Sequence, residues 1–156
     1  MVKKHIVLFL FIPLLLTGCT RRNFNVSWDN AYDAGISSDI SSTLRWEPPD
    51  RLIITYTNNT DLLLGYGLGH DLQKYSGEHW VSVPNIVEPY VNQPLFNLQP
   101  NASFDRVVYL SHYGNLRRGS YRVVMNFTED RFDETTGILA ADRLEFEVFA
   151  EFEITR

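Results

Sequence analysis

The strongest constraint on the fold is a run of alternating side chains near the end of the chain. Between residues 144 and 154, six apolar positions alternate with four glutamates and one phenylalanine. Successive side chains of a β-strand point to opposite faces, so this period of two predicts a strand with one face in a core and one in water. The apolar positions are Leu144, Phe146, Val148, Ala150, Phe152 and Ile154. Their face needs a second sheet to cover it.

Short extended segments recur upstream, separated by turn signals. The expected strands cover residues 43–46, 52–57, 68–75, 80–83, 104–110 and 121–127. Ser76-Gly77 predicts a tight hairpin between two of them, and residues 84–101, with four prolines, are expected to form a loop. No long amphipathic helix is evident in this part of the sequence. Short strands at roughly ten-residue spacing without helices predict an all-β sandwich or barrel.

The first eighteen residues have the pattern of an export signal. Lys3 and Lys4 precede an apolar run over residues 6–16 that only Pro13 interrupts. A helix of this length rises about 16 Å, which is too short for the roughly 30 Å hydrocarbon core of a bilayer. The run is therefore expected to be a signal peptide rather than a transmembrane helix.

The residues after this run, Leu16-Thr17-Gly18-Cys19, resemble the lipobox of bacterial lipoprotein precursors. The resemblance implies that a signal peptidase recognises Leu16, Thr17 and Gly18, and that the sulfur of Cys19 takes up a diacylglycerol. Cys19 is the only cysteine, so it cannot form an internal disulfide, and a lone cysteine in an exported chain needs an explanation. The alternative is an ordinary secretory peptide with a chance cysteine. Two acyl chains would anchor the protein stably to the membrane, on the outer side of the cytoplasmic membrane.

Charge and length limit the partners and the organisation. Without Lys3 and Lys4, 12 basic residues face 19 acidic ones, a formal charge of −7. This argues against nucleic acid and against an anionic lipid surface as partners, with Arg21 and Arg22 beside the anchor as the exception. The expected organisation is a signal peptide (1–18), a lipidated cysteine with a tether (19–36), and one domain (37–156).

Several segments resemble the bacterial immunoglobulin-like domains of small envelope lipoproteins. Residues 52–60, ending in Thr-Asn-Asn-Thr, resemble their strand B, and residues 66–84 resemble the hairpin that follows. Residues 98–101 resemble the turn before strand E, with Asn101 where glycine is usual. Residues 116–122 resemble the beginning of strand F. The resemblance covers about residues 37–155 and implies an immunoglobulin-like sandwich of about seven antiparallel strands.

Two further details bear on this resemblance. Gly119 and Tyr121 at a strand start resemble a tyrosine corner, in which the hydroxyl bonds back to the backbone. Ordinary core packing of Tyr121 is the alternative. Val123 stands where the second core cysteine would be, so packing replaces the disulfide. Residues 128–142 form a longer and more acidic connection between strands F and G than such domains are expected to have.

The sequence predicts neither an enzyme nor a metal or cofactor site. His70, His79 and His112 lack paired-ligand spacing and are expected to be solvated or at strand edges. The glycines at 65, 67 and 69 indicate a bulge or close strand approach rather than a phosphate loop, which would need a following helix. Residues 129–134 include four carboxylates, for which a solvated hairpin loop is expected and Ca²⁺ binding is the alternative.

Recognition by exposed aromatic side chains is the remaining prospect. Trp80, Tyr90 and Phe96 lie in or near the proline-rich segment, and alternation places Phe149 on the wet face of its strand. These four residues form the candidate binding surface. The leading hypothesis is a lipid-anchored, non-catalytic domain for binding or structural roles at the cell envelope, with an unidentified protein partner. The alternative is a protease inhibitor similar to the bacterial intracellular proteinase inhibitor family, with residues 84–101 as the inhibitory loop.

Overall fold

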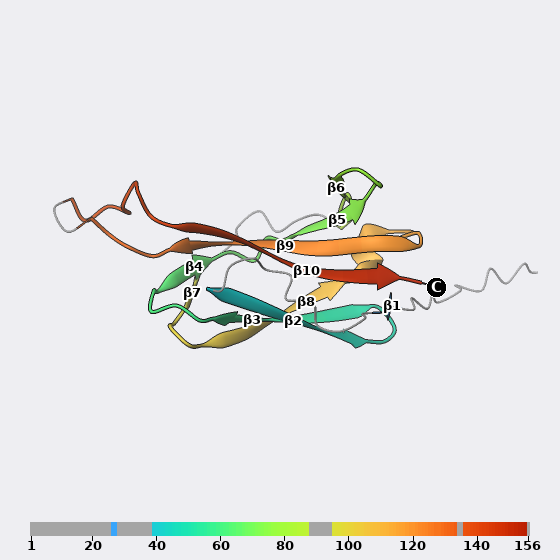
Figure 1. Cartoon of the computed structure of the whole chain (residues 1–156), viewed down its shortest axis with the longest axis horizontal. Helices are drawn as coiled ribbons and strands as arrows, with labels where there is room; N and C mark the ends of the chain where they lie inside the picture. Colours follow the sequence, from blue (N-terminus) through green and yellow to red (C-terminus); the bar gives the residue numbers. More distant parts are fainter. Residues whose placement is uncertain (1–25, 28–38, 88–94, 134–135, 156) are drawn as a thin grey trace, which may run out of the picture.

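The chain folds as two antiparallel β-sheets packed face to face (Figure 1). The computed structural model describes residues 26–27, 39–87, 95–133 and 136–155. The smaller sheet contains, in order, β2 (Ile40–Glu47), β3 (Arg51–Asn58) and β8 (Ser103–Tyr109). A 3-10 turn over Leu110–Tyr113 follows β8.

The larger sheet has β9 (Gly119–Glu129) at its centre. On one side β9 pairs with β10 (Glu145–Ile154), and β10 pairs at its end with β1 (Val26–Ser27). On its other side the first half of β9 pairs with β5 (Asp71–Tyr75) and the second half with β4 (Leu64–Tyr66). The remaining strands are β6 (Trp80–Ser82), which pairs with β5, and β7 (Phe96–Leu98), which pairs with β4. The predicted immunoglobulin-like sandwich is thus confirmed.

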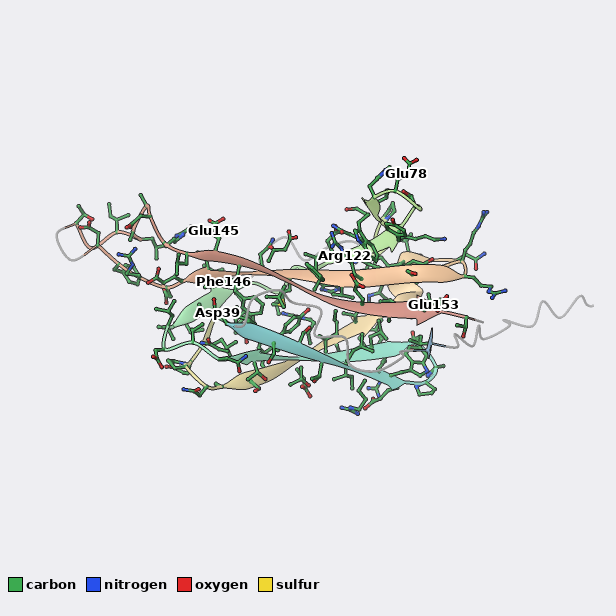
Figure 2. The ribbon with its side chains drawn as sticks, in the orientation of Figure 1. Asp39, Glu78, Arg122, Glu145, Phe146 and Glu153 are labelled. Carbon is green, nitrogen blue, oxygen red and sulfur yellow. The ribbon has the colours of Figure 1, made fainter. Side chains whose placement is uncertain are left out.

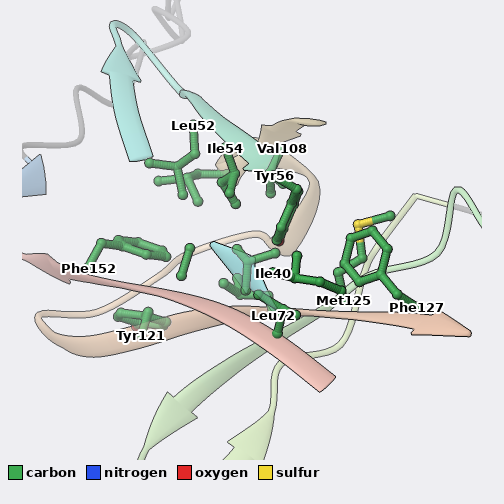
Figure 3. Packing of buried hydrophobic residues seen from close by; sticks show 14 of the residues in the cluster. Ile40, Leu52, Ile54, Tyr56, Leu72, Val108, Tyr121, Met125, Phe127 and Phe152 are labelled. Atoms are coloured by element: carbon green, nitrogen blue, oxygen red, sulfur yellow. The ribbon is translucent and has the colours of Figure 1, made fainter. Parts of the chain in front are cut away.

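The core lies between the sheets. Figure 3 shows side chains of β3 and β8 facing those of β5, β9 and β10. The labelled residues are Leu52, Ile54, Tyr56 and Val108 on one side and Leu72, Tyr121, Met125, Phe127 and Phe152 on the other, with Ile40 from β2. Burying each large apolar side chain contributes about 1.5–3 kcal/mol relative to leaving it exposed. Apolar burial on both inner faces therefore stabilises a sandwich that has no disulfide.

The alternation predicted over residues 144–154 is confirmed at five of its six apolar positions. Val148, Ala150, Phe152 and Ile154 are buried, and Phe146 is partly buried against the core. Leu144 is the exception, because 53% of its surface is exposed. It precedes β10 and belongs to the connection over 130–144, which projects past the sandwich (Figure 1). Leu144 is therefore not among the described residues that form or pack against the core cluster.

Three short strands were not predicted. β1 lies inside the expected tether, and β7 lies inside the segment expected to be a loop. β4 also escaped prediction, and β5 begins at Asp71 rather than at residue 68. Two or three residues contain too few alternations to indicate a strand, so these elements depend on pairing with β9, β10 or each other. Gly65 in β4 lies close to β9, where a Cβ would be 3.6 Å from the Thr128 carbonyl oxygen.

Two motifs of the family resemblance have clear structural roles. The Tyr121 hydroxyl donates a 2.6 Å hydrogen bond to the Arg117 carbonyl, which confirms the tyrosine corner. Val123 is fully buried, as expected for packing in place of a disulfide. Asn101 has φ of 58°, a left-handed conformation that asparagine tolerates better than most residues, so it can replace the usual glycine.

Asn58, at the end of β3, is a fully buried polar side chain. Its amide nitrogen donates to the carbonyls of Leu62, Leu98 and Gln99 at 2.8, 3.3 and 3.2 Å. Its amide oxygen accepts bonds from the backbone and the hydroxyl of Thr60 at 3.0 and 2.7 Å. The Thr-Asn-Asn-Thr motif therefore joins β3 to the turns before β4 and after β7.

Candidate functional site

Two of the four candidate binding residues meet around an arginine on the outer face of the larger sheet. The Arg122 guanidinium carbon lies 4.7 Å from the ring centroid of Trp80 and 4.7 Å from that of Phe149. Trp80 comes from β6, Arg122 from β9 and Phe149 from β10. We call these three residues, together with Asp71, Gln73 and Ser82, the Arg122 platform.

Strand register explains this meeting. Tyr121 and Val123 point into the core, so Arg122 between them points outward (Figure 2). Arg122 is paired with Gln73 of β5 on one side and with Glu151 of β10 on the other. Phe149 lies two residues before Glu151 on the same face of β10, and an aromatic side chain can reach Arg122 across this diagonal.

Hydrogen bonds hold the arginine from one side. Arg122 Nε donates to Gln73 Oε1 at 2.7 Å, and Gln73 Nε2 donates to Asp71 Oδ2 at 2.8 Å. The Ser82 hydroxyl donates to the same carboxylate oxygen at 2.6 Å. Within the described residues, no carboxylate lies at ion-pair distance from Arg122. The contacts of Arg122 among the described residues are thus one neutral hydrogen bond and two aromatic rings.

The aromatic side chains of the platform are partly shielded. Phe149 is half-buried, although alternation placed it on the wet face, because Arg122 covers its ring. Trp80 is half-buried as well, and its ring packs 5.2 Å from that of Tyr75, which is 42% exposed. The backbone of β10 is held here by Ser42, whose hydroxyl donates to the Phe149 carbonyl at 3.1 Å.

The other two candidate residues do not join this platform. Phe96 of β7 stacks on Tyr66 at 5.6 Å, and Tyr66 in turn stacks on Phe104 at 4.1 Å. Phe96 thus belongs to an aromatic group that continues from the core. Tyr90 lies outside the described residues, as does much of the proposed inhibitory loop, so the protease-inhibitor alternative stays a prediction.

Sequence reasoning missed Arg122, Gln73 and Asp71. No motif marks them, because they become neighbours only through the register of β5 against β9. The one available signal was the alternation within residues 121–127, which indicates that Arg122 points outward. The alternation does not indicate which residues of the adjacent strands lie beside Arg122.

His70 is less solvated than the sequence suggested. Its Nε2 lies 3.0 Å from the Tyr113 hydroxyl. Burial lowers the pKa of His70, and the nearby positive charge of Arg106 lowers it further. Arg106 itself donates to the Gly67 carbonyl at 3.1 Å. Burial also raises the pKa of Tyr113 to about 12. His70 is therefore half-buried against Tyr113 rather than solvated.

The described residues hold no group of three or more histidine, cysteine or carboxylate side chains suited to a metal ion. His79 is exposed, and His112 stacks on Tyr109 at 5.2 Å.

The acidic connection is a hairpin arm with internal ion pairs. Arg131 lies 3.1 Å from Glu129 and 2.9 Å from Asp142, and a bridge joins Phe132 to Leu139. The hydrogen bond from Arg131 lowers the pKa of Asp142. Glu129 is buried rather than solvated and accepts a bond from the Leu144 backbone at 3.2 Å. Glu134 lies outside the described residues, so the Ca²⁺ alternative stays untested.

These features define a class: an immunoglobulin-like β-sandwich with a tyrosine corner and an exposed arginine–aromatic platform. The sequence profile of the bacterial Ig-like domain family matches residues 34–153, and the chain belongs to that family. Domains of this family are generally non-catalytic. No curated protein and no solved structure matches the chain. In the described part of the chain, no helix has the length and hydropathy needed to cross a membrane.

Proposed function

We propose that the protein is a lipid-anchored bacterial lipoprotein that presents its Ig-like domain to a protein partner at the cell envelope. The anchor is Cys19, after cleavage of residues 1–18, and the protein faces the outside of the cytoplasmic membrane. The lipobox pattern of Leu16, Thr17, Gly18 and Cys19 supports the anchor. The domain supplies recognition rather than catalysis.

The Arg122 platform is the proposed contact surface. Its supporting observation is that Trp80 and Phe149, 69 positions apart in the chain, both pack at 4.7 Å on one guanidinium that has no carboxylate at ion-pair distance among the described residues. Tryptophan, tyrosine and arginine dominate the binding energy of protein interfaces because they combine a large apolar area with directional hydrogen bonding. A planar guanidinium that is already oriented by Gln73 loses little conformational entropy on binding.

The partner should offer neutral acceptors to this arginine. Glu147 and Glu151 flank Phe149 on the same outward face of β10 and would repel a strongly acidic surface. Backbone carbonyls or amide oxygens of a protein segment satisfy Arg122 without that repulsion. A protein partner is therefore favoured over an anionic polymer.

The anchor is tested by substitution of its cysteine. The wild-type protein should fractionate with membranes and yield an N-terminal peptide with the mass of a diacylglyceryl cysteine. Cys19→Ser should remove the modification and release the protein. A wild-type N-terminus without lipid would contradict the anchor.

The platform is tested by photocrosslinking in intact cells at native expression. A benzoylphenylalanine at Tyr75, beside Trp80, should crosslink to a defined protein, and Arg122→Ala should abolish the product. The matched control is a benzoylphenylalanine at Tyr109, which is 40% exposed but lies on the other sheet. Absence of a product at Tyr75, or a product that is the same at both positions, would contradict the proposed surface.

A further inference from the structure

β1 determines where the chain leaves the sandwich toward Cys19. Val26 pairs with Ile154, and Ser27 pairs with Glu153, at the C-terminal end of β10 (Figure 1). Val26 follows Cys19 by seven positions. An extended chain of that length spans at most about 25 Å. A lipid on Cys19, which is part of the proposed function, would therefore keep this end of the sandwich close to the bilayer. We call it the anchor end.

The anchor end has exposed positive charge. Ile154 pairs with Gly119, the first residue of β9, and the loop before Gly119 exposes Arg117 and Arg118. Within the described residues neither arginine has an ion-pair partner.

Lys74 adds a third charge at the same place. Its side chain packs against Gly119, where a Cβ would come within 3.3 Å of Lys74 Cε, and its ammonium lies 5.4 Å from the Tyr121 ring centroid. Among the described residues, Arg45 and Arg51 of the β2–β3 hairpin add two positive charges at this end, and the acidic residues there are Glu47, Asp50, Glu78 and Glu153 (Figure 1). Basic side chains thus narrowly outnumber acidic ones at this end, in a chain whose overall charge is negative.

The opposite end is acidic. Figure 2 shows Glu145 at the far end of β10 from Glu153, beside the projecting arm. The described acidic residues there outnumber the basic ones, Arg131 and Arg143. They are Glu129, Asp130, Asp133, Asp142 and Glu145. An anionic surface would therefore attract one end of the sandwich and repel the other, and the Debye length limits both effects to about 10 Å at 0.1 M salt.

We propose that the anchor end is a docking surface for anionic lipid headgroups of the membrane that holds Cys19. Lys74, Arg117 and Arg118 contact the headgroups, and the acidic arm points away from the bilayer. The sheets then stand upright, which leaves the Arg122 platform on the side of the domain and open to a partner. This orientation rests on the proposed anchor but needs the additional charge asymmetry described here.

The test uses the full chain, processed and lipidated in cells, purified and reconstituted in phosphatidylcholine vesicles with or without 30% phosphatidylglycerol. Lipid attachment consumes the sulfur of the only cysteine. A cysteine introduced as Asn115→Cys, before β9, or as Ala141→Cys, in the arm, then accepts a donor dye. Energy transfer to an acceptor lipid reports the height of each label. β9 alone is about 35 Å long, so we expect transfer from position 115 to be about twofold or more above that from 141.

Two charge-matched double variants decide between docking and free rotation. R117E/R118E should bring the two labels to similar transfer, as should vesicles without phosphatidylglycerol. R131E/R143E makes the same change in net charge at the far end and should preserve the difference. Equal transfer from both labels in the anionic vesicles, or a difference that R117E/R118E leaves intact, would overturn the orientation. Loss of the protein from the vesicles in an alkaline wash would overturn the anchor as well, so the two failures are distinguishable.

Discussion

The Tyr121 hydroxyl and the Arg117 carbonyl form a 2.6 Å hydrogen bond across the turn that leads into β9. Tyr121 is almost fully buried, and its ring stacks on Phe152 of β10 at 5.7 Å. The turn that exposes Arg117 and Arg118 is thereby tied to the core of the sandwich. The conformation of this turn at the anchor end therefore depends on the packing of β9 against β10.

Removing that hydroxyl should weaken the fold measurably. We expect Tyr121→Phe to lower the free energy of unfolding by about 0.5–1.5 kcal/mol, because the Arg117 carbonyl loses its buried donor while the ring packing stays. Urea denaturation measures the change. Tyr109→Phe, on an exposed tyrosine, should alter stability by less than about 0.5 kcal/mol. Equal effects of the two variants would speak against a tyrosine corner with a structural role.

Asn58 should be among the most sensitive polar positions. Asn58→Ala removes five hydrogen bonds, among them the donor to the buried Leu98 carbonyl and the acceptor of the Thr60 backbone and hydroxyl, so we expect a loss of about 2–4 kcal/mol. The neighbouring Asn59→Ala removes an exposed 3.2 Å bond to Ser41 and should cost less than about 1 kcal/mol. Thermal unfolding of both variants gives the comparison. A similar cost at the two positions would contradict the assigned role of Asn58.

The left-handed conformation of Asn101 predicts an ordering of substitutions. Asn101→Ala should destabilise the protein by about 1 kcal/mol, because a Cβ without a locally bonding side chain is disfavoured at positive φ. Asn101→Gly should stay within about 0.5 kcal/mol of wild type. The melting temperatures of the two variants test this ordering, and a more stable alanine variant would reverse it.

His70 should make the fold sensitive to mild acid. Its pKa in the folded protein is lowered from the ordinary value of 6.5 by burial first and by Arg106 second. The unfolded chain therefore binds the proton more readily, so stability is lost as pH falls below about 6.5.

Urea unfolding at pH 7.5 and pH 5.5 should show this loss in the wild type. It should also show a smaller loss in His70→Asn, because that variant lacks the imidazole whose pKa is lowered by folding. His79→Asn, on an exposed histidine, serves as the control and should behave as the wild type does. If the two asparagine variants respond to pH alike, His70 is not the group responsible.

Much of the fold was predictable because burial leaves a local pattern. Val148, Ala150, Phe152 and Ile154 reveal their common face through spacing alone, and Tyr121 with Gly119 marks the start of β9. The pattern failed where an apolar residue lies outside the core cluster, as at Leu144. It also failed where a strand is two or three residues long, as in β4 and β7.

The candidate site was predictable only in part. Trp80 and Phe149 were recognisable as large side chains near exposed positions. Arg122 was not, because its contacts come from the alignment of three strands that are distant in sequence. Phe96 and Phe149 are the same residue type, yet Phe96 packs on Tyr66 and Phe149 packs on Arg122. Residue type alone therefore could not tell which of the two belongs to the platform. Non-local register decides which exposed aromatic residues share a surface.

The pairing of Val26 with Ile154 also sets the reach of the domain under tension. With Cys19 anchored as proposed, a pull on the segment before Val26 acts first on a strand of two residues, before it loads the packed sheets. The 21 positions from Cys19 to Ile40 span at most about 75 Å when extended, three times the span from Cys19 to Val26. On that proposal, opening of β1 lengthens the reach of the domain from its anchor while the core stays folded.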